Sequence, residues 1–197
     1  WSEMDTLLKL PGRARRAADN SFDISCPAPA PVQDSPGGGT ALSSLNGIVV
    51  DNTSAKLTGK WTTGSNLAHV GSDYTYARGP GHTATFEFSV PADGRYEVRF
   101  AYTAQPNRAS NVPVTILHAD GENVVMINER ETPPIAGHFV SLGQFRFEQD
   151  GAGYVLVSNE GTDGYVIVDA LQLIAADTRT DAAAPAVAGD NRENRKN

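Results

Sequence analysis

The stretch ATFEFSVPADGRYEVRFAY, residues 84–102, decides the fold. Apolar and polar side chains alternate along residues 84–90, and they alternate again along residues 96–102. This period of two is typical of a β-strand that buries one face. The connecting residues 91–94, Pro-Ala-Asp-Gly, have the chemistry of a tight hairpin, because proline fixes φ and glycine accepts positive φ. The stretch therefore predicts two half-buried antiparallel strands joined by a hairpin.

Seven further runs have the character of strands, and Gly, Asp and Asn residues punctuate the chain between them. These runs are residues 48–51, 74–78, 112–118, 123–128, 139–147, 154–158 and 166–174. No helical pattern intervenes. The sequence therefore predicts an all-β fold, an antiparallel β-sandwich of the jelly-roll type. An immunoglobulin-type sandwich stays open as the competing topology.

The segments that flank this region have a different composition. Residues 1–26 predict a short broken helix and a loop, because Pro11 and Gly12 interrupt apolar positions at helical spacing. Residues 27–46 are rich in Pro, Gly and Ser and predict a linker, whereas residues 177–197 lack large apolar side chains and are expected to be disordered. The sandwich is thus placed at residues 47–176. Since the chain starts at Trp1 and has no signal peptide, we expect it to be a carboxy-terminal or processed piece of a longer polypeptide.

Charge and composition argue against several classes of protein. A net charge of -7 disfavours binding to nucleic acid or to anionic membranes, and no apolar stretch approaches the ~20 residues that a membrane span requires. The single cysteine, Cys26, excludes an internal disulfide and any CxxC zinc or redox motif. We therefore expect a domain that is held together by its core alone, with neither a nucleic-acid partner nor membrane insertion.

Catalytic and metal-binding motifs are also missing from the sequence. The four histidines do not have the spacing of a metal-ligand set, and no GxSxG elbow, P-loop or dinucleotide fingerprint is present. Acidic pairs such as Glu129 and Glu131 fall at turns, where solvated charges are ordinary. Oxygen-rich loops leave a structural calcium as a weaker alternative to Asx-turns. The sequence therefore predicts a module that is not an enzyme, with no cofactor and no metal site.

Residues 48–174 resemble the golvesin carboxy-terminal-like domain, which is also described as a xanthan-lyase carbohydrate-binding-like domain. Five stretches carry the resemblance by their order and spacing. They are GIVVDNTSAKLTGKWTTGS from Gly47, HVGSDYTYA from His69, FSVPADGRYEVRFAY from Phe88, NRASNVPVTILHADG from Asn107 and SNEGTDGYVIVDALQLI from Ser158.

The resemblance implies a β-sandwich with a galactose-binding-like jelly roll, found at the end of bacterial extracellular lyases, peptidases and FAD-dependent oxidoreductases. The catalytic or flavin-binding part of such a parent enzyme is not in this sequence. The resemblance also implies an extracellular, cell-surface or periplasmic location. A polysaccharide or a domain of the parent enzyme is the implied partner.

Carbohydrate recognition requires aromatic faces that stack on sugar rings and planar polar groups that bond to hydroxyls. We expect loops and strand ends of the sandwich to supply both kinds of group. The candidate carbohydrate-binding residues are Trp61, Tyr74, Tyr76, Asn107, Arg108 and Asn111. Two of them have a purely structural alternative, since Trp61 also suits the core and Arg108 also suits a role in pinning its own loop.

Two functions remain open at this point. One is an accessory carbohydrate-binding module of a larger secreted or surface enzyme, which requires exposed aromatic residues. The other is a structural or protein-interaction sandwich without a sugar ligand, for which an exposed apolar patch would be the sign. The exposure of Trp61, Tyr74 and Tyr76 discriminates between the two.

Asp169 lies in the middle of the apolar run 166–174. An unpaired carboxylate at such a position would be costly. We therefore expect Asp169 to accept hydrogen bonds from a loop backbone or from an arginine, as part of the architecture.

Overall fold

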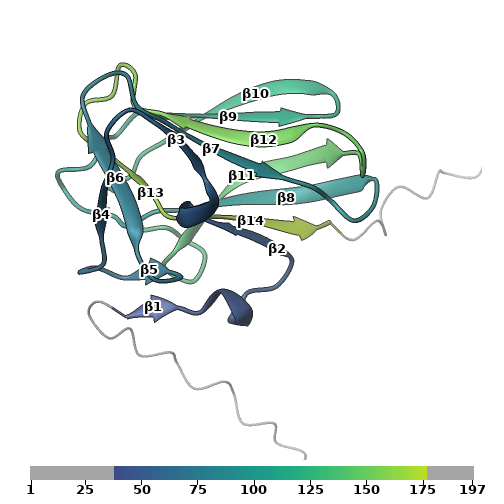
Figure 1. Ribbon diagram of the computed structural model, residues 1–197, viewed down its shortest axis with the longest axis horizontal. Coiled ribbons are helices and arrows are strands. Elements are labelled where there is room, and N and C mark those ends of the chain that lie inside the picture. Colours follow the sequence, from purple (N-terminus) through teal and green to yellow (C-terminus); the bar gives the residue numbers. More distant parts are fainter. Residues whose placement is uncertain (1–37, 177–197) are drawn as a thin grey trace, which may run out of the picture. The chain divides into compact units, whose positions relative to one another are not determined.

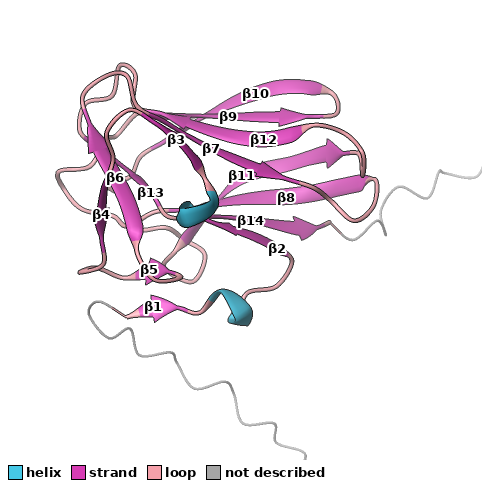
Figure 2. Cartoon of the chain, viewed as in Figure 1, coloured by secondary structure: helices cyan, strands magenta, loops and turns pink. Residues whose placement is uncertain are grey.

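The computed structural model describes residues 38–176, and most of this part of the chain is β-strand (Figure 1). The expected helix at residues 1–26, residues 27–37 of the expected linker and the tail 177–197 lie outside the described residues. Figure 2 shows that strands dominate and that helix is confined to short segments. These segments are the 3-10 turns η1 (Leu42–Ser44) and η2 (Asn52–Ser54).

Two antiparallel sheets form the layers of a sandwich. The five-stranded sheet has the order β10 (Gly121–Ile127), β9 (Val112–His118), β12 (Gly153–Ser158), β7 (Thr83–Phe88) and β3 (Lys56–Thr58). The four-stranded sheet has the order β11 (Phe139–Phe147), β8 (Gly94–Ala101), β14 (Ala170–Ala175) and β2 (Ile48–Asp51). Because apolar and polar side chains alternate along the strands, the apolar ones point between the two sheets. They form one shared core, whose fully buried members include Phe86, Phe100, Val114 and Leu171. The predicted all-β antiparallel sandwich is therefore confirmed.

A smaller sheet crosses one end of the sandwich, at the left of Figure 1. It consists of β13 (Tyr165–Val168), β6 (Tyr74–Arg78) and β4 (Thr62–Gly64). A two-stranded parallel pair, β1 (Gly39–Thr40) with β5 (His69–Val70), completes the described strands. The sequence pattern did not predict β1, β3, β4 or β5, because two or three residues are too few to show a period.

The predicted hairpin at residues 91–94 is wrong. Strand β7 pairs with β12 and β3, whereas β8 pairs with β11 and β14, so residues 91–94 cross from one sheet to the other. Phe86 on β7 and Phe100 on β8 are both fully buried in the same core. The two strands therefore meet through their apolar faces, and not through their hydrogen-bonding edges.

The single strand predicted at residues 166–174 is also wrong, because Asp169 divides it. Residues before Asp169 form β13 of the end sheet, and residues after it form β14 of the four-stranded sheet. Asp169 is almost fully buried, and its carboxyl oxygens accept hydrogen bonds from the Val70 N–H at 3.0 and 3.2 Å. Its own N–H donates to the carbonyl of Ala101 at 3.2 Å. Asp169 thus accepts hydrogen bonds from a backbone N–H, but the donor lies on strand β5 and not on a loop, and the bonds hold a corner of the fold.

The loop of residues 103–111 lies along β13 and is held there by main-chain hydrogen bonds. The Ala109 N–H donates to the Tyr165 carbonyl at 2.8 Å, and the Tyr165 N–H donates to the Asn107 carbonyl at 3.1 Å. This approach requires a glycine at position 164, because a Cβ there would stand 2.4 Å from the carbonyl oxygen of Arg108. The loop is therefore fixed to the edge of the end sheet.

An ion pair between Asp163 and Arg130 also holds the main chain of this loop. The Asp163 carboxylate accepts from the Ser110 N–H at 2.7 Å and from the Arg130 Nη2 at 2.7 Å. Arg130 Nε in turn donates to the carbonyl of Arg108 at 2.8 Å. The pair is exposed, so its effect on stability is small, but its geometry fixes the main chain around Arg108.

We predict that Asp169→Asn is as stable as the natural chain or more stable at neutral pH. Burial, followed by the nearby Asp51 and Asp73, raises the pKa of Asp169, while the Val70 N–H opposes the rise. The pKa of such a carboxyl is higher in the folded chain than in the unfolded chain. Its contribution to the free energy of unfolding is fully present at pH values below the unfolded-state pKa. This contribution is lost as the pH rises through the folded-state pKa. The asparagine keeps an acceptor for the Val70 N–H and does not ionise.

Urea unfolding at several pH values above 4 measures this difference. As the pH rises, the free energy of unfolding of the Asn variant should increase relative to that of the natural chain. Asp169→Ala leaves the Val70 N–H unpaired, so its free energy of unfolding should be lower by about 1–3 kcal/mol. An Asn variant that loses as much as the Ala variant at neutral pH would show that the ionised carboxylate is needed.

We further predict that Gly164→Ala lowers the free energy of unfolding by about 1–3 kcal/mol, because the new methyl group must displace the main chain at Arg108 and Ala109. Gly94→Ala is the matched control, since a Cβ at that position meets only a Tyr96 ring atom at 3.7 Å. Chemical denaturation of both variants checks the prediction. Equal stability of the two variants would contradict the close packing of the loop on β13.

Candidate functional site

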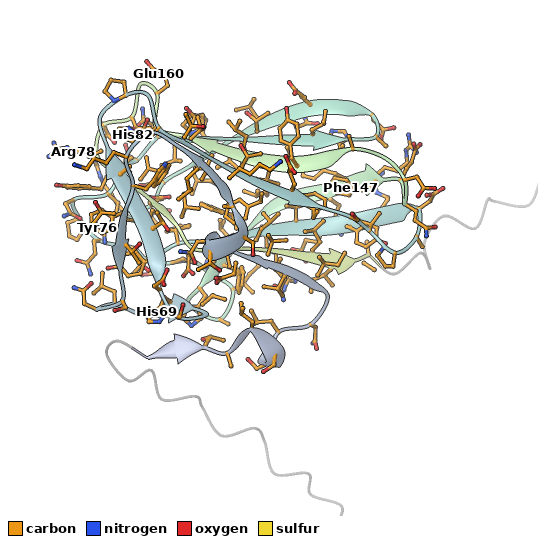
Figure 3. All side chains as sticks on the ribbon, viewed as in Figure 1. His69, Tyr76, Arg78, His82, Phe147 and Glu160 are labelled. Carbon is orange, nitrogen blue, oxygen red and sulfur yellow. The ribbon has the colours of Figure 1, made fainter. Side chains whose placement is uncertain are left out.

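A cavity of about 500 Å³ opens between the end sheet and the loop of residues 103–111. Its lining comes from β4 and the residues after it, from β6 and β13, and from the loop. The lining residues are Thr63, Gly64, Asn66, Leu67, Tyr74, Tyr76, Gln105, Asn107, Arg108 and Tyr165. Figure 3 labels Tyr76 on β6 at this end of the sandwich, with Phe147 at the opposite end.

Three tyrosines form the aromatic part of the lining. Their rings pack in sequence, with centroids 6.2 Å apart for Tyr74 and Tyr76 and 6.0 Å apart for Tyr76 and Tyr165. Tyr76 and Tyr165 are half-buried, whereas the ring of Tyr74 is buried and leaves no room for a Cβ at Gly64. The guanidinium of Arg78 lies 5.3 Å from the centroid of the Tyr165 ring, a cation–π contact. The rings are tilted against one another, so they do not form one flat platform.

The hydroxyl group of Tyr74 is tied into the polar part of the cavity. It donates to Asn66 Oδ1 at 2.7 Å. Burial raises the pKa of Tyr74, and the neighbouring Arg108 guanidinium opposes the rise. The hydroxyl therefore stays protonated over the physiological range and serves as a neutral hydrogen-bonding group.

Arg108 lies in the wall of the cavity with only 7% of its surface exposed. Its Nε donates to the Thr103 carbonyl at 3.3 Å, and its Nη1 donates to Asn107 Oδ1 at 3.1 Å. These bonds hold the guanidinium plane within its own loop, as the structural alternative for Arg108 expected. The Tyr74 side chain is a further hydrogen-bonding neighbour of the guanidinium, which carries five N–H donors in all.

Behind this wall lies Glu129, whose side chain is fully buried. Its Oε2 accepts from the Ile167 N–H at 2.8 Å, and its main-chain N–H donates to the Ala109 carbonyl at 2.9 Å. Burial raises the pKa of Glu129 well above its usual value, although the Ile167 N–H and the nearby Arg108 act in the opposite direction. Burial therefore favours the neutral, protonated carboxyl.

The structure brings together four of the six residues that the sequence singled out, namely Tyr74, Tyr76, Asn107 and Arg108. Trp61 does not line the cavity. Its indole N–H donates to the Thr58 carbonyl at 2.9 Å, and its ring packs edge-on against His82 and against the core.

Asn111 also lies outside the lining. Its amide nitrogen donates to the Gly161 carbonyl at 2.9 Å, and its amide oxygen accepts from the Asp163 N–H at 3.0 Å. Both ends of the side chain are thus occupied in joining two loops.

Sequence reasoning missed Asn66, Gln105 and Tyr165 as lining residues. Gln105 precedes Asn107 in the same loop and carries the same kind of amide group, so composition was a usable signal. Tyr165 follows the turn signal of residues 162–164 and begins a strand, but its position beside Arg108 depends on the pairing of β13 with β6 and on the loop that lies along β13.

The lining residues offer hydrogen-bond donors and acceptors from tyrosine hydroxyl, amide and guanidinium groups. They include no Asp, Glu, His or Cys side chain. Within residues 38–176, no three His, Cys, Asp or Glu side chains gather in an arrangement that could hold a metal ion. The same residues contain no helix that is long and apolar enough to cross a membrane. The arrangement suits the binding of a polar ligand with some apolar surface.

Several known proteins share this architecture. The xanthan lyase of Bacillus sp. (strain GL1) is 30% identical over 141 residues, which cover 66% of this chain and 15% of the lyase. A solved structure of Paenibacillus xanthan lyase matches with a TM-score of 0.60 and 29% identity, over 65% of this chain and 13% of the lyase. A Podospora anserina GH26-CBM35 β-(1,4)-mannanase shares the fold at a TM-score of 0.51 and 19% identity, over 68% of this chain and 28% of the mannanase.

The sequence model of the Golvesin C-terminal domain family matches residues 48–175. These residues run from the first residue of β2 to the last residue of β14, so the match includes both main sheets, the end sheet and the cavity. The chain therefore belongs to the Golvesin C-terminal domain family.

Proposed function

We propose that this sandwich is a non-catalytic accessory module that binds a polysaccharide in the cavity of the end sheet. The observation that carries the proposal is the composition of the lining, in which tyrosine rings stand beside amide groups and an arginine. Aromatic faces pack against the C–H surfaces of a sugar, and planar amide and guanidinium groups bond to its hydroxyls in fixed geometry. Tyr76, Tyr165, Asn107 and Arg108 are the contact residues that we assign, with Tyr74 and Asn66 as further lining residues.

The parent of the module is proposed to be a larger secreted or surface enzyme. The chain spans 15% of the curated xanthan lyase that it matches, so most of that enzyme has no counterpart here. A module that holds such an enzyme at its polymer raises the local concentration of substrate without any chemistry of its own. An extracellular, surface or periplasmic location is part of the same proposal.

A structural or protein-interaction role is the second candidate, and one observation favours it. Val124 and Met126 on the edge strand β10 are 61% and 57% exposed. They are two residues apart on one strand and therefore point to the same face. Apolar side chains of this kind suit packing against the parent enzyme or another chain. This candidate predicts that no polysaccharide binds.

We predict that affinity electrophoresis of the 197-residue chain through gels that contain neutral or acidic polysaccharides will show retardation by one class of polymer. Tyr76→Ala and Asn107→Ala should each weaken binding about tenfold or more, equivalent to ~1.4 kcal/mol, because each removes a group that faces the cavity. Tyr154→Ala is the matched control, since Tyr154 lies on β12 and does not line the cavity.

Thermal unfolding of each variant establishes that it is folded. Retardation that Tyr76→Ala abolishes and Tyr154→Ala leaves unchanged would support the binding module. No retardation by any polysaccharide would contradict it and would favour the interaction role of β10.

A further inference from the structure

The guanidinium of Arg108 forms no ion pair within the described part of the chain. The five ion pairs of residues 38–176 involve Lys56, Arg99, Arg130 and Arg146, and none of them includes Arg108. Yet Arg108 is only 7% exposed. A buried charge is costly unless an opposite charge or a full set of hydrogen bonds accompanies it. The position of Arg108 in the wall of an open cavity leaves room for a ligand to supply that partner.

The other groups around the cavity do not neutralise Arg108. Among the ten lining residues Arg108 is the one charged side chain, and none is a carboxylate. Glu129 is fully buried and close enough for its pKa to be lowered by Arg108, but the two side chains form no ion pair, and Glu129 does not line the cavity. Asp163 lies on the far side of the loop and is engaged by Arg130 and Ser110. The one charged side chain that lines the cavity is therefore a cation, in a chain whose net charge is -7.

The hydrogen bonds of Arg108 leave part of its fork unused. The Thr103 carbonyl takes Nε–H, the Asn107 side chain takes one hydrogen of Nη1, and the Tyr74 side chain is a third hydrogen-bonding neighbour, which leaves part of the five-donor set free. The main chain at this position is fixed by Arg130 on one side and by Gly164 on the other. A planar guanidinium that is already held in place suits a carboxylate group better than it suits a single hydroxyl.

We propose that the ligand of this cavity is an acidic sugar, one that bears a carboxylate, and that Arg108 pairs with this carboxylate. The inference rests on the proposed function and adds the chemical class of the sugar. A neutral sugar would cover the guanidinium and remove it further from water without supplying a counter-charge. The same desolvation that disfavours the neutral sugar strengthens the ion pair with the acidic one.

The test compares a polysaccharide with its own carboxyl-reduced form. Carbodiimide activation followed by borohydride reduction converts each carboxylate into a primary alcohol and leaves the glycosidic backbone in place. The probes are a panel of acidic polysaccharides, their reduced forms and neutral polysaccharides, presented to the 197-residue chain in affinity gels. We expect retardation by a carboxylate-bearing polymer, and at least a tenfold loss of affinity after reduction of its carboxyl groups.

Two variants of Arg108 and one control assign the effect to this side chain. Arg108→Gln removes the charge and should weaken binding to the acidic polymer about tenfold or more, whereas Arg108→Lys keeps the charge without the fork and should lose less. Arg95→Gln is the control, because Arg95 is exposed at the start of β8 and its replacement changes the net charge equally. If the Gln variant does not fold, the Lys variant and the reduced polymers still decide the question.

The possible results separate this inference from the function on which it rests. Retardation by a neutral polysaccharide that depends on Tyr76, or undiminished retardation after carboxyl reduction, overturns the acidic-sugar inference and leaves the binding module standing. Loss of affinity in Arg95→Gln equal to that in Arg108→Gln also overturns it, because the effect would then be one of net charge alone. Absence of retardation by every polymer overturns both.

Discussion

One buried carboxyl group, that of Asp169, determines where the end sheet meets the sandwich. Its oxygens accept hydrogen bonds from the N–H of Val70 on β5, while its own N–H donates to the carbonyl of Ala101 at the end of β8. The strand that passes through it therefore has to leave one sheet and enter another at this residue. Because β6 and β13 carry Tyr74, Tyr76 and Tyr165, the aromatic lining of the cavity depends on this corner.

The electrostatics of the cavity follow from the same packing. Asp169 and Glu129 are both buried near the end sheet, and burial raises the pKa of each, which favours their neutral forms. Neither provides Arg108 with an ion pair within the described residues. The one charged side chain of the cavity lining therefore has no ion-pair partner within residues 38–176, which is the basis of the proposed pairing with a carboxylate of the ligand.

The sequence predicted local features well and long-range partners poorly. Alternation in residues 84–90 and 96–102 identified both strands, because each strand that buries one face shows the period of two in its own sequence. It did not reveal that the two strands lie in different sheets, since that depends on β12, β11 and β14 far along the chain. Four residues that line the cavity could be selected by their chemistry alone. Tyr165 could not, because its position depends on the pairing of β13 with β6. Trp61 packs against the core and Asn111 bonds to a neighbouring loop, so neither lines the cavity.

The order of strands in the four-stranded sheet has a consequence for the biogenesis of the protein. Strand β14 is the last described strand along the chain, yet it lies between β8 and β2. During synthesis from the amino terminus, β2 has no partner in this sheet until β14 has left the ribosome, and one edge of β8 stays open for as long. The sheet then closes over a separation that reaches from Ile48 to Leu173, which makes its completion slow compared with a local hairpin. A chain that ends before β14 would consequently lack an interior strand of this sheet, and β2 would have no partner in it.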